Sequence, residues 1–496
     1  MGQLWLCMPS VSRCYRIKQT ISSVTLSREG RIGRDNILEP AYFSVVYKMY
    51  KIFYSETNKK YLYDSISNNF FEVDEESFSL LNGLEGKTQE LQCLGMEFWE
   101  SIYGSDPLPN LNEMPITTES AEMPEILVLE LTQQCNFRCE YCVYSGHYKY
   151  ERKHQNTKMS KETIDTVVDK YFKTEQSPDY VSLYGGEPLL QFPLIQYLVQ
   201  KIEETGKHPE YAMTTNGSLV LNDSIAQFLV EKKVRLTISY DGLNHDLYRK
   251  TINHEQTSEM VFKALELLKR IDEDYFKEYI SLSITLAPPY QLAENAKYFN
   301  SHKLLSQLRL LVNTVNDQDS DFFDNIDMKK EKQKLSDDYR VLAKEFIKMD
   351  GFGKPFHKAL FADAMLRIED RVMSLQTKAY PPGPCTPGKN RLFITATGNK
   401  YMCERVGNYG CLGNIEDNEK PIELYHSVLT DFKECITPYC KECLYVRMCD
   451  ACYSLFRESD HMADDNRIKD ICNEKRKWFD FMIYVFLSKK ERENLE

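Results

Sequence analysis

Long apolar runs are missing from this sequence. No stretch of its 496 residues reaches the roughly 20 apolar positions that a membrane-spanning helix needs, and no secretory signal is recognisable. A surplus of positive charge is missing too, because 74 acidic residues against 62 basic ones leave a formal net charge of −12. These absences argue against membrane and nucleic-acid partners. They predict a soluble, cytoplasmic, globular protein.

Cysteine, in contrast, is abundant and clustered. Three of the 15 cysteines lie between Cys135 and Cys142, and nine lie between Cys385 and Cys472. In a chain without an export signal the surroundings are expected to be reducing, so grouped thiols indicate metal binding before disulfides.

The chain divides into four segments of different composition. Residues 1–48 carry an excess of basic side chains and show only a weak helical periodicity, and we expect a poorly ordered extension there. Residues 49–115 form a small α+β unit, with strands expected at 50–54 and 60–64 and a helix opening after Asp74. Residues 120–350 alternate between strand and helix patterns, and residues 375–485 are rich in glycine, proline and cysteine.

Six strand patterns recur in the third segment, with helical stretches between them. Strand followed by helix in this way predicts parallel βα units, whose chemistry lies at the carboxyl ends of the strands. The expected strands are at 125–131, 180–186, 211–217, 234–242, 279–287 and 308–315, and a charged helix is expected near 329–350.

The first cysteine group directly follows the first of these strands. Its spacing is Cys135-x3-Cys139-x2-Cys142, within LTQQCNFRCEYC. Three thiolates on a short loop can bind three irons of a cubane and leave the fourth iron open to a small molecule. The alternative is a zinc site, which would need a fourth ligand, and His147 is the nearest candidate.

This loop resembles the defining motif of the radical S-adenosylmethionine (SAM) superfamily. The resemblance extends over about residues 125–320 and implies a partial (β/α)6 TIM-like barrel. It also implies a [4Fe-4S] cluster on Cys135, Cys139 and Cys142, and cleavage of SAM to a 5′-deoxyadenosyl radical that abstracts hydrogen from a substrate. The residues that it implies for SAM contact are Tyr141, Gly185, Gly186, Glu187, Pro188, Asn216, Ser239, Asp241 and Arg249.

Each of these residues has a role in the family and a plainer alternative. Tyr141 would pack on the adenine, and GGEP (185–188) would receive the methionyl amino group. TTNG (214–217) and SYDG (239–242) would line the ribose and methionine, and Arg249 would pair with a carboxylate. The alternatives are a surface tyrosine, ordinary turn residues and a solvated arginine.

The second cysteine group resembles the SPASM domain, which carries two auxiliary iron–sulfur clusters. In the central run of closely spaced cysteines, the last gap, between Cys449 and Cys452, is x2 where the family usually has x3. The resemblance implies an outer cluster, an inner cluster whose fourth ligand is Cys411, Cys435 or absent, and, as the alternative, zinc sites in a ribbon-like module. The outer ligands would be Cys440, Cys443, Cys449 and Cys472, and the inner ones Cys385, Cys403 and Cys452.

Substrate and partners follow from the resemblance alone. The unit at 49–115 is similar to winged-helix-like leader-recognition domains, which bind an extended peptide by strand addition. We therefore expect a maturase that installs a thioether or C–C crosslink in a ribosomally made precursor peptide, with a reductant such as flavodoxin or ferredoxin. Formylglycine formation of the anaerobic sulfatase-maturase type is one alternative. A non-enzymatic zinc-binding interaction protein is another, and no general base can be named.

Overall fold

A computed structural model describes most of the chain and leaves the expected extension at 1–48 and all of 80–122 outside the described residues. The described residues are 50–65, 68–75, 78–79, 123–371, 385, 388–407, 409–417, 422–440, 443–458 and 461–493.

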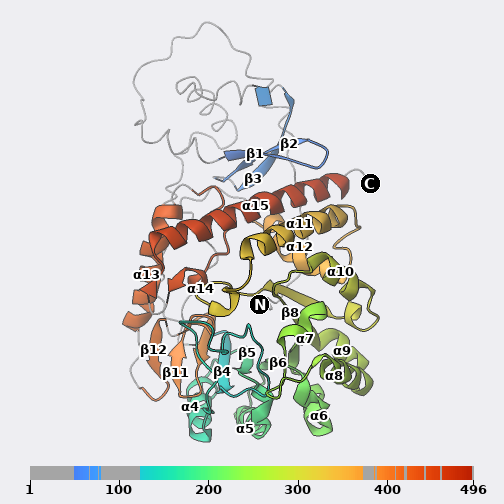
Figure 1. Ribbon diagram of the computed structural model, residues 1–496. Helices are drawn as coiled ribbons and strands as arrows, with labels where there is room; N and C mark the ends of the chain where they lie inside the picture. Colours follow the sequence, from blue (N-terminus) through green and yellow to red (C-terminus); the bar gives the residue numbers. More distant parts are fainter. Residues whose placement is uncertain are drawn as a thin grey trace.

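A nine-stranded sheet forms the centre of the molecule, in the order β12-β11-β10-β4-β5-β6-β7-β8-β9 (Figure 1). The run from β4 to β9 is parallel throughout and confirms the six predicted βα units of a partial barrel. These strands are β4 (Ile126–Thr132), β5 (Tyr180–Gly185), β6 (Glu210–Thr215), β7 (Arg235–Ser239), β8 (Ile280–Leu286) and β9 (Arg309–Thr314).

Side-chain alternation explains why the barrel has an apolar outside and a polar inside. Along β8, Leu282 and Ile284 are fully buried in the core that the helices share, whereas Ser281 and Ser283 are only half-buried. Successive strand residues point to opposite faces, so the serines line the inner face. Ser239 of β7 lies beside Ser283 in the register, which continues this polar lining. The inner face therefore suits a polar ligand.

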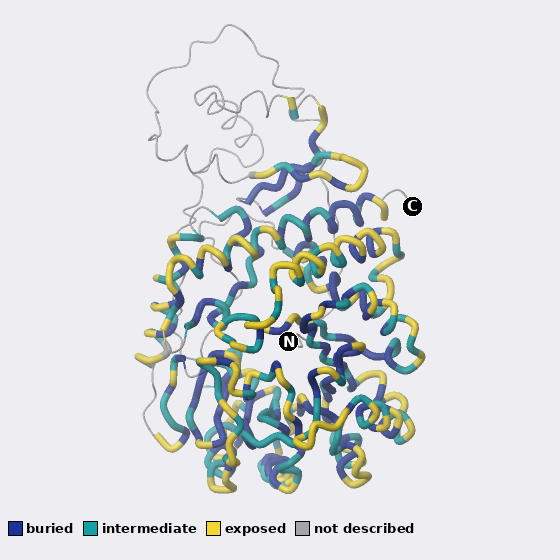
Figure 2. The backbone as a smooth tube through the Cα atoms, viewed as in Figure 1, coloured by how far each residue is buried: buried dark blue, intermediate teal, exposed yellow. Residues whose placement is uncertain are grey.

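Helices cover the outer face, and the side that each turns away from the sheet is exposed (Figure 2). None of the described helices is both long and apolar enough to cross a membrane. The principal covering helices are α4 (Lys161–Tyr171), α5 (Phe192–Glu203), α6 (Asp223–Glu231), α8 (Ser258–Ile271), α10 (Leu292–Ser301), α11 (Met328–Ile347) and α12 (Pro355–Glu369). The helix predicted near 329–350 is α11.

The cysteine-rich segment extends the barrel sheet, which the sequence analysis did not predict. Its first strand pairs in parallel with β4, and the next two strands continue antiparallel. The segment therefore shares a hydrogen-bonded edge with the strand that leads into the first cysteine loop. Its elements are β10 (Arg391–Ile394), β11 (Asn399–Tyr401), β12 (Cys411–Asn414), α13 (Ile422–Cys440), α14 (Tyr453–Phe456), β13 (Arg457–Glu458), β14 (His461–Met462) and α15 (Asp465–Glu493).

The N-terminal unit is an antiparallel sheet of β1 (Tyr50–Tyr54), β2 (Lys60–Asp64) and β3 (Asn69–Val73). The first two strands match the prediction, but β3 was wrongly assigned to the start of the helix. Phe78 N donates to Asp74 O at 2.9 Å, so a helical turn does begin after Asp74. The spacing of the buried aromatic residues in this stretch fits a strand as well as a helix, which explains the error.

One face of this small sheet packs on α15, the long C-terminal helix (Figure 1). The ring centroids of Phe70 and Phe486 are 6.0 Å apart, and both side chains are buried. At the other end of the sheet, Glu56 N donates to Ser488 Oγ at 2.8 Å. The N-terminal unit is therefore docked on the last helix of the described chain.

We predict that Phe70→Ala lowers the free energy of unfolding by about 3–5 kcal/mol, because it empties a buried aromatic site between the sheet and α15. Tyr54→Ala is the control in the same sheet. Its side chain is 46% exposed, and the expected change is within about 0.5 kcal/mol. Denaturant unfolding measures both variants, and equal effects would show that the sheet is not held by α15.

Candidate active site

The three cysteines of the first group lie on a loop that directly follows β4 at the carboxyl edge of the sheet. An adjacent segment pins this loop through backbone pairing. Phe137 bridges to Thr251, and Arg138 N donates to Lys250 O at 2.8 Å. The loop therefore has a fixed backbone on which the three sulfur atoms are carried.

Backbone and side-chain N–H groups point at these sulfurs. Phe137 N lies 3.4 Å from Cys135 Sγ, and Tyr144 N lies 3.4 Å from Cys142 Sγ. Asn216 Nδ2 approaches Cys135 Sγ at 3.9 Å. Donors of this kind stabilise a thiolate, so the donor set fits a thiolate-bound iron–sulfur cluster.

Burial acts in the opposite direction. It raises the pKa of Cys135 to about 12 and the pKa of Cys139 to about 11, and it also raises the pKa of Cys142. The metal-free thiols therefore hold their protons at neutral pH. Binding iron releases those protons and couples cluster assembly to this loop.

The two glycines of GGEP let β5 approach the cysteine loop. A Cβ on Gly185 would lie 2.2 Å from Thr132 O, and one on Gly186 would lie 2.2 Å from Gln134 O. Because no Cβ is present, the two backbones can meet. Gly186 N donates to Thr132 O at 2.9 Å and Glu187 N to Gln134 O at 2.8 Å. Only glycine permits this backbone contact.

Glu187 ties the ends of neighbouring strands together. Its buried carboxylate accepts from Thr215 Oγ1 and Asn216 N at 2.8 Å each, and from Leu189 N at 3.1 Å. Burial raises the pKa of Glu187 to about 7, although the three donors counteract it. Pro188 then begins a short 3-10 helix. The hydrogen-bond donors around the Glu187 carboxylate in this arrangement thus come from the protein itself.

A buried ion pair lies on the other side of the loop. Asp241 accepts from Arg249 Nε at 2.7 Å, from Thr285 N at 2.9 Å, and from the hydroxyl of Tyr141. The Arg249 guanidinium lies 5.5 Å from the Tyr141 ring centroid, and its Nη1 is 3.9 Å from Cys139 Sγ. Arg249 and Tyr141 are both buried, so the solvated alternatives for them are wrong.

The remaining expected SAM residues also lie at the strand ends. Ser239 is the last residue of β7 and is buried. Asn216 Nδ2 donates to Asn136 Oδ1 at 2.8 Å, which links the end of β6 to the cysteine loop. The structure therefore brings the nine expected residues to one edge, and their contact with SAM stays a prediction.

A buried charged group beside the loop was missed. Glu130 of β4 accepts from Tyr144 Oη at 2.9 Å and from Ala396 N at 3.0 Å. The Arg152 guanidinium lies 4.5 Å above the Phe393 ring, with Nη2 donating to a backbone oxygen of the cysteine-rich domain. The sequence signal that could have revealed this group is a glutamate inside the otherwise apolar run EILVLEL.

The C-terminal cysteines fall into two groups in space. Burial first, and then the charges of Cys443, Cys449 and Cys472, raise the pKa of Cys440, so these four lie close together. Burial also raises the pKa of Cys385, which lies within reach of Arg391 and Cys452.

Cys403 lies near the second group, because the charges of Cys385 and Cys403 both raise the pKa of the same guanidinium, that of Arg391. Cys411 is exposed at the start of β12, and Cys435 of α13 interacts with the charge of Cys472. All twelve described cysteines are free thiols.

No group of three histidine, cysteine or acidic side chains among the described residues is arranged around a single metal ion. In a cubane each thiolate binds its own iron, so a cluster does not require that arrangement. The fourth-ligand candidate His147 is 46% exposed, and its Nδ1 pairs with Asp321 at 2.6 Å.

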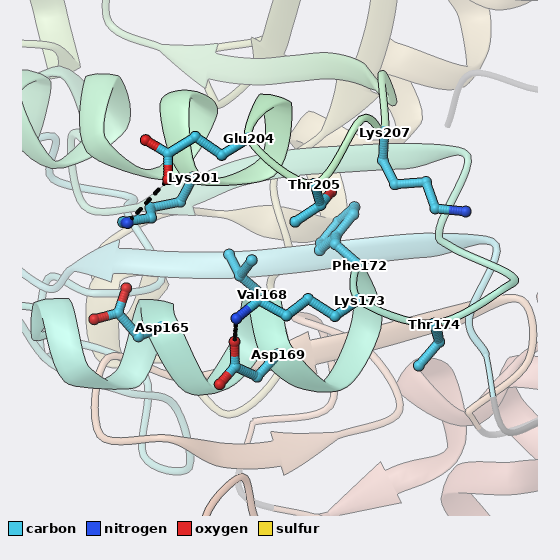
Figure 3. A pocket seen from close by; sticks show the side chains of 10 residues that line it. All are labelled: Asp165, Val168, Asp169, Phe172, Lys173, Thr174, Lys201, Glu204, Thr205 and Lys207. Carbon is cyan, nitrogen blue, oxygen red and sulfur yellow. Dashed lines mark hydrogen bonds and ion pairs between the residues drawn. The ribbon is translucent and has the colours of Figure 1, made fainter.

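A hollow of about 620 Å³ lies between α4 and α5, away from this site (Figure 3). Its rim carries ion pairs of 2.6 Å between Lys173 and Asp169 and 3.0 Å between Lys201 and Glu204. It lies where the helices end and the next strands begin, opposite the carboxyl edge. Its position separates it from the cysteine loop.

Comparison with known proteins identifies the class. Residues 129–289 match the family model of the radical SAM superfamily. The chain therefore carries a radical SAM domain, which supports the expected enzyme over the alternative of a non-enzymatic zinc-binding protein.

Among individual relatives, the radical SAM cyclopropyl synthase TigE of Paramaledivibacter caminithermalis is 22% identical over 403 residues, covering 73% of this chain and 79% of its own. Among solved structures, native anSMEcpe with bound AdoMet has a TM-score of 0.53 at 20% identity, covering 74% of this chain and 99% of that one. Native anSMEcpe with bound AdoMet and the Kp18Cys peptide has the same TM-score of 0.53 at 19% identity, with 74% and 99% covered. These likenesses show a shared fold.

We predict that Asp241→Asn lowers the free energy of unfolding by about 3–5 kcal/mol, because it leaves the buried Arg249 guanidinium without its counter-charge. Asp169→Asn is the matched control. It breaks an ion pair with Lys173 whose two side chains are each 60% exposed, and we expect a change below about 1 kcal/mol. Denaturant unfolding distinguishes them, and similar losses would show that Asp241 is not the centre of a buried pair.

Proposed function

We propose that the protein is a radical SAM/SPASM peptide maturase of the cytoplasm that installs a thioether or C–C crosslink in a ribosomally made peptide. The observation that carries the proposal is the antiparallel sheet β1–β3 docked on the cysteine-rich domain. SAM cleavage requires only the barrel edge described above, so this sheet has another task. A sheet with strand edges is suited to an extended peptide.

The described sheet has two edge strands, β1 and β3, because its order is β1-β2-β3. A leader segment could add to such an edge through backbone hydrogen bonds, with side-chain pockets adding selectivity. The inward face packs on α15, so the leader would bind at an edge and not across that face. The leader would then be held beside the cysteine-rich domain.

Two similarities favour this reading. The fold is shared with anSMEcpe, which has been solved with a bound peptide. The relative TigE is named a cyclopropyl synthase, and a cyclopropyl ring is made by forming a carbon–carbon bond. The first similarity supports a peptide substrate for this chain, and the second supports bond-forming chemistry.

The residues of the site would divide the work in a defined way. Cys135, Cys139 and Cys142 would hold a [4Fe-4S] cluster, and the strand ends would hold SAM above it. When bound, the reduced cluster and SAM supply the 5′-deoxyadenosyl radical that removes a hydrogen atom from the substrate. The polar inner face of the barrel would orient the peptide, and an electron carrier such as flavodoxin or ferredoxin would supply electrons.

The C-terminal cysteines would hold two auxiliary clusters. Cys440 and the three cysteines close to it would form the outer set, and Cys385, Cys403 and Cys452 would form the inner set. The fourth ligand of the inner set would be Cys411 or Cys435, or it would be absent and leave one iron not held by cysteine. About twelve irons per chain follow from three cubanes.

We predict that Cys135→Ala abolishes formation of 5′-deoxyadenosine by anaerobically reconstituted, reduced enzyme, because three thiolates are needed to hold the cluster that cleaves SAM. Chromatography of the products measures this. Ser145→Ala, on the same loop but outside the donor set, should keep wild-type turnover. Turnover by the Cys135 variant would refute the ligand assignment.

We predict that the enzyme, co-expressed with a precursor peptide encoded beside it, yields a product that has lost a pair of hydrogens per crosslink. Mass spectrometry detects the loss, and the product should not react with hydrazides because no aldehyde forms. Omitting the leader from the peptide should reduce modification at least tenfold. Shortening the peptide is the sharper test, because truncating the enzyme would uncover α15.

A hydrazide-reactive product would instead assign the enzyme to formylglycine formation. Full modification of a leaderless peptide would remove the leader-binding role from β1–β3 and leave the radical chemistry in place.

A further inference from the structure

The loop between Cys443 and Cys449 touches the N-terminal sheet. Tyr445, near the middle of this loop, stacks on Tyr63 of β2, with ring centroids 6.4 Å apart and planes 13° apart. Tyr63 has no exposed surface, and Tyr445 is buried as well. A residue of the sheet therefore supports a loop that carries two cysteines of the outer group.

Tyr445 also connects the loop to α15. Its ring stacks on Phe479 at 5.5 Å, and its hydroxyl donates to Asp480. Lys51 of β1 reaches the same carboxylate, with Nζ 2.5 Å from Oδ1. Asp480 therefore receives one donor from the cysteine loop and one from the N-terminal sheet.

The same helix carries another cysteine of the outer group. Cys472 precedes Phe479 by seven residues, which is about two helical turns and places both on one side of α15. The loop itself is tightly turned, since Cys443 N donates to Cys440 O at 3.1 Å and Val446 N to Cys443 O at 3.2 Å. A shift of Tyr445 would therefore move Cys443 and Cys449 relative to Cys472.

We infer that the N-terminal sheet is a structural part of the outer auxiliary cluster site. Tyr63 is a positioning residue that holds the Cys443–Cys449 loop through Tyr445, and Lys51 reinforces it through Asp480. The inference rests on the proposed auxiliary clusters. It gives the sheet a second task, because the sheet proposed to hold the leader at an edge also supports the metal site through its inward face.

The test is iron content together with the electron paramagnetic resonance spectrum of the reduced, reconstituted full-length enzyme. Tyr63→Leu keeps an apolar side chain but removes the stacked ring. We expect its iron to fall from about twelve toward about eight per chain, with loss of one auxiliary signal. The signal that shifts when SAM is added, from the cluster of the barrel, should persist. Cys443→Ala gives the reference spectrum for loss of the outer cluster.

Two variants separate positioning from general loss of structure. Tyr63→Phe restores the ring and should restore full iron content. Leu62→Ala changes the neighbouring residue of β2, which is equally buried but belongs to the opposite face of the sheet, and it should keep full iron. Asp480→Asn, which weakens the link of α15 to Tyr445 and Lys51, serves if Tyr63→Leu does not fold, and it should lower the iron content in the same way.

Wild-type iron and spectrum in a folded Tyr63→Leu or Asp480→Asn variant would overturn the inference. So would equal iron loss in Leu62→Ala, because the effect would then be loss of the sheet as a whole. About four irons in the wild-type enzyme would instead refute the auxiliary clusters themselves, and the inference would fail with the proposed cluster assignment.

Discussion

The parallel pairing of β10 with β4 is the contact on which the organisation of the molecule depends. Leu392 and Phe393 lie opposite Leu127 and Val128 in this register. Strand β4 leads directly into the first cysteine loop, so the pairing joins the cysteine-rich domain to the barrel beside that loop. The buried group around Glu130 crosses the same joint. The two cysteine-bearing regions are therefore fixed relative to each other by main-chain hydrogen bonds and not by a flexible linker.

Within the barrel, the site is assembled by contacts between strand ends. Gly186 brings β5 against the cysteine loop, Glu187 joins β5 to β6, and Asp241 joins β7 to β8 and to Arg249. Each group that could contact a ligand is thus also a link between neighbouring strands. Substitutions here are expected to change stability and ligand binding together.

The sequence was sufficient for the barrel and for the cysteine loop. The six βα units have strong strand periodicity, and motif residues such as Asp241 and Gly185 lie at the strand ends because parallel strands end at one edge. It was insufficient for β3, where strand and helix patterns overlap around Phe71. It was also insufficient for the pairing of β10 with β4, because contacts between segments more than 250 residues apart leave no local pattern. For Arg249 the sequence analysis expected a carboxylate partner but did not identify it as Asp241, which is only eight residues away.

The docking of β1–β3 on α15 has a consequence for biosynthesis. Lys51 and its partner Asp480 are 429 residues apart in sequence, so the sheet emerges from the ribosome long before the helix that covers it. Its aromatic face, including Tyr63 and Phe70, has no α15 to pack on until that later part of the chain has been translated. Exposed strand edges and apolar surface during that interval favour aggregation and chaperone binding. Insertion of the proposed outer auxiliary cluster would also have to wait, because Cys472 lies on the same late helix.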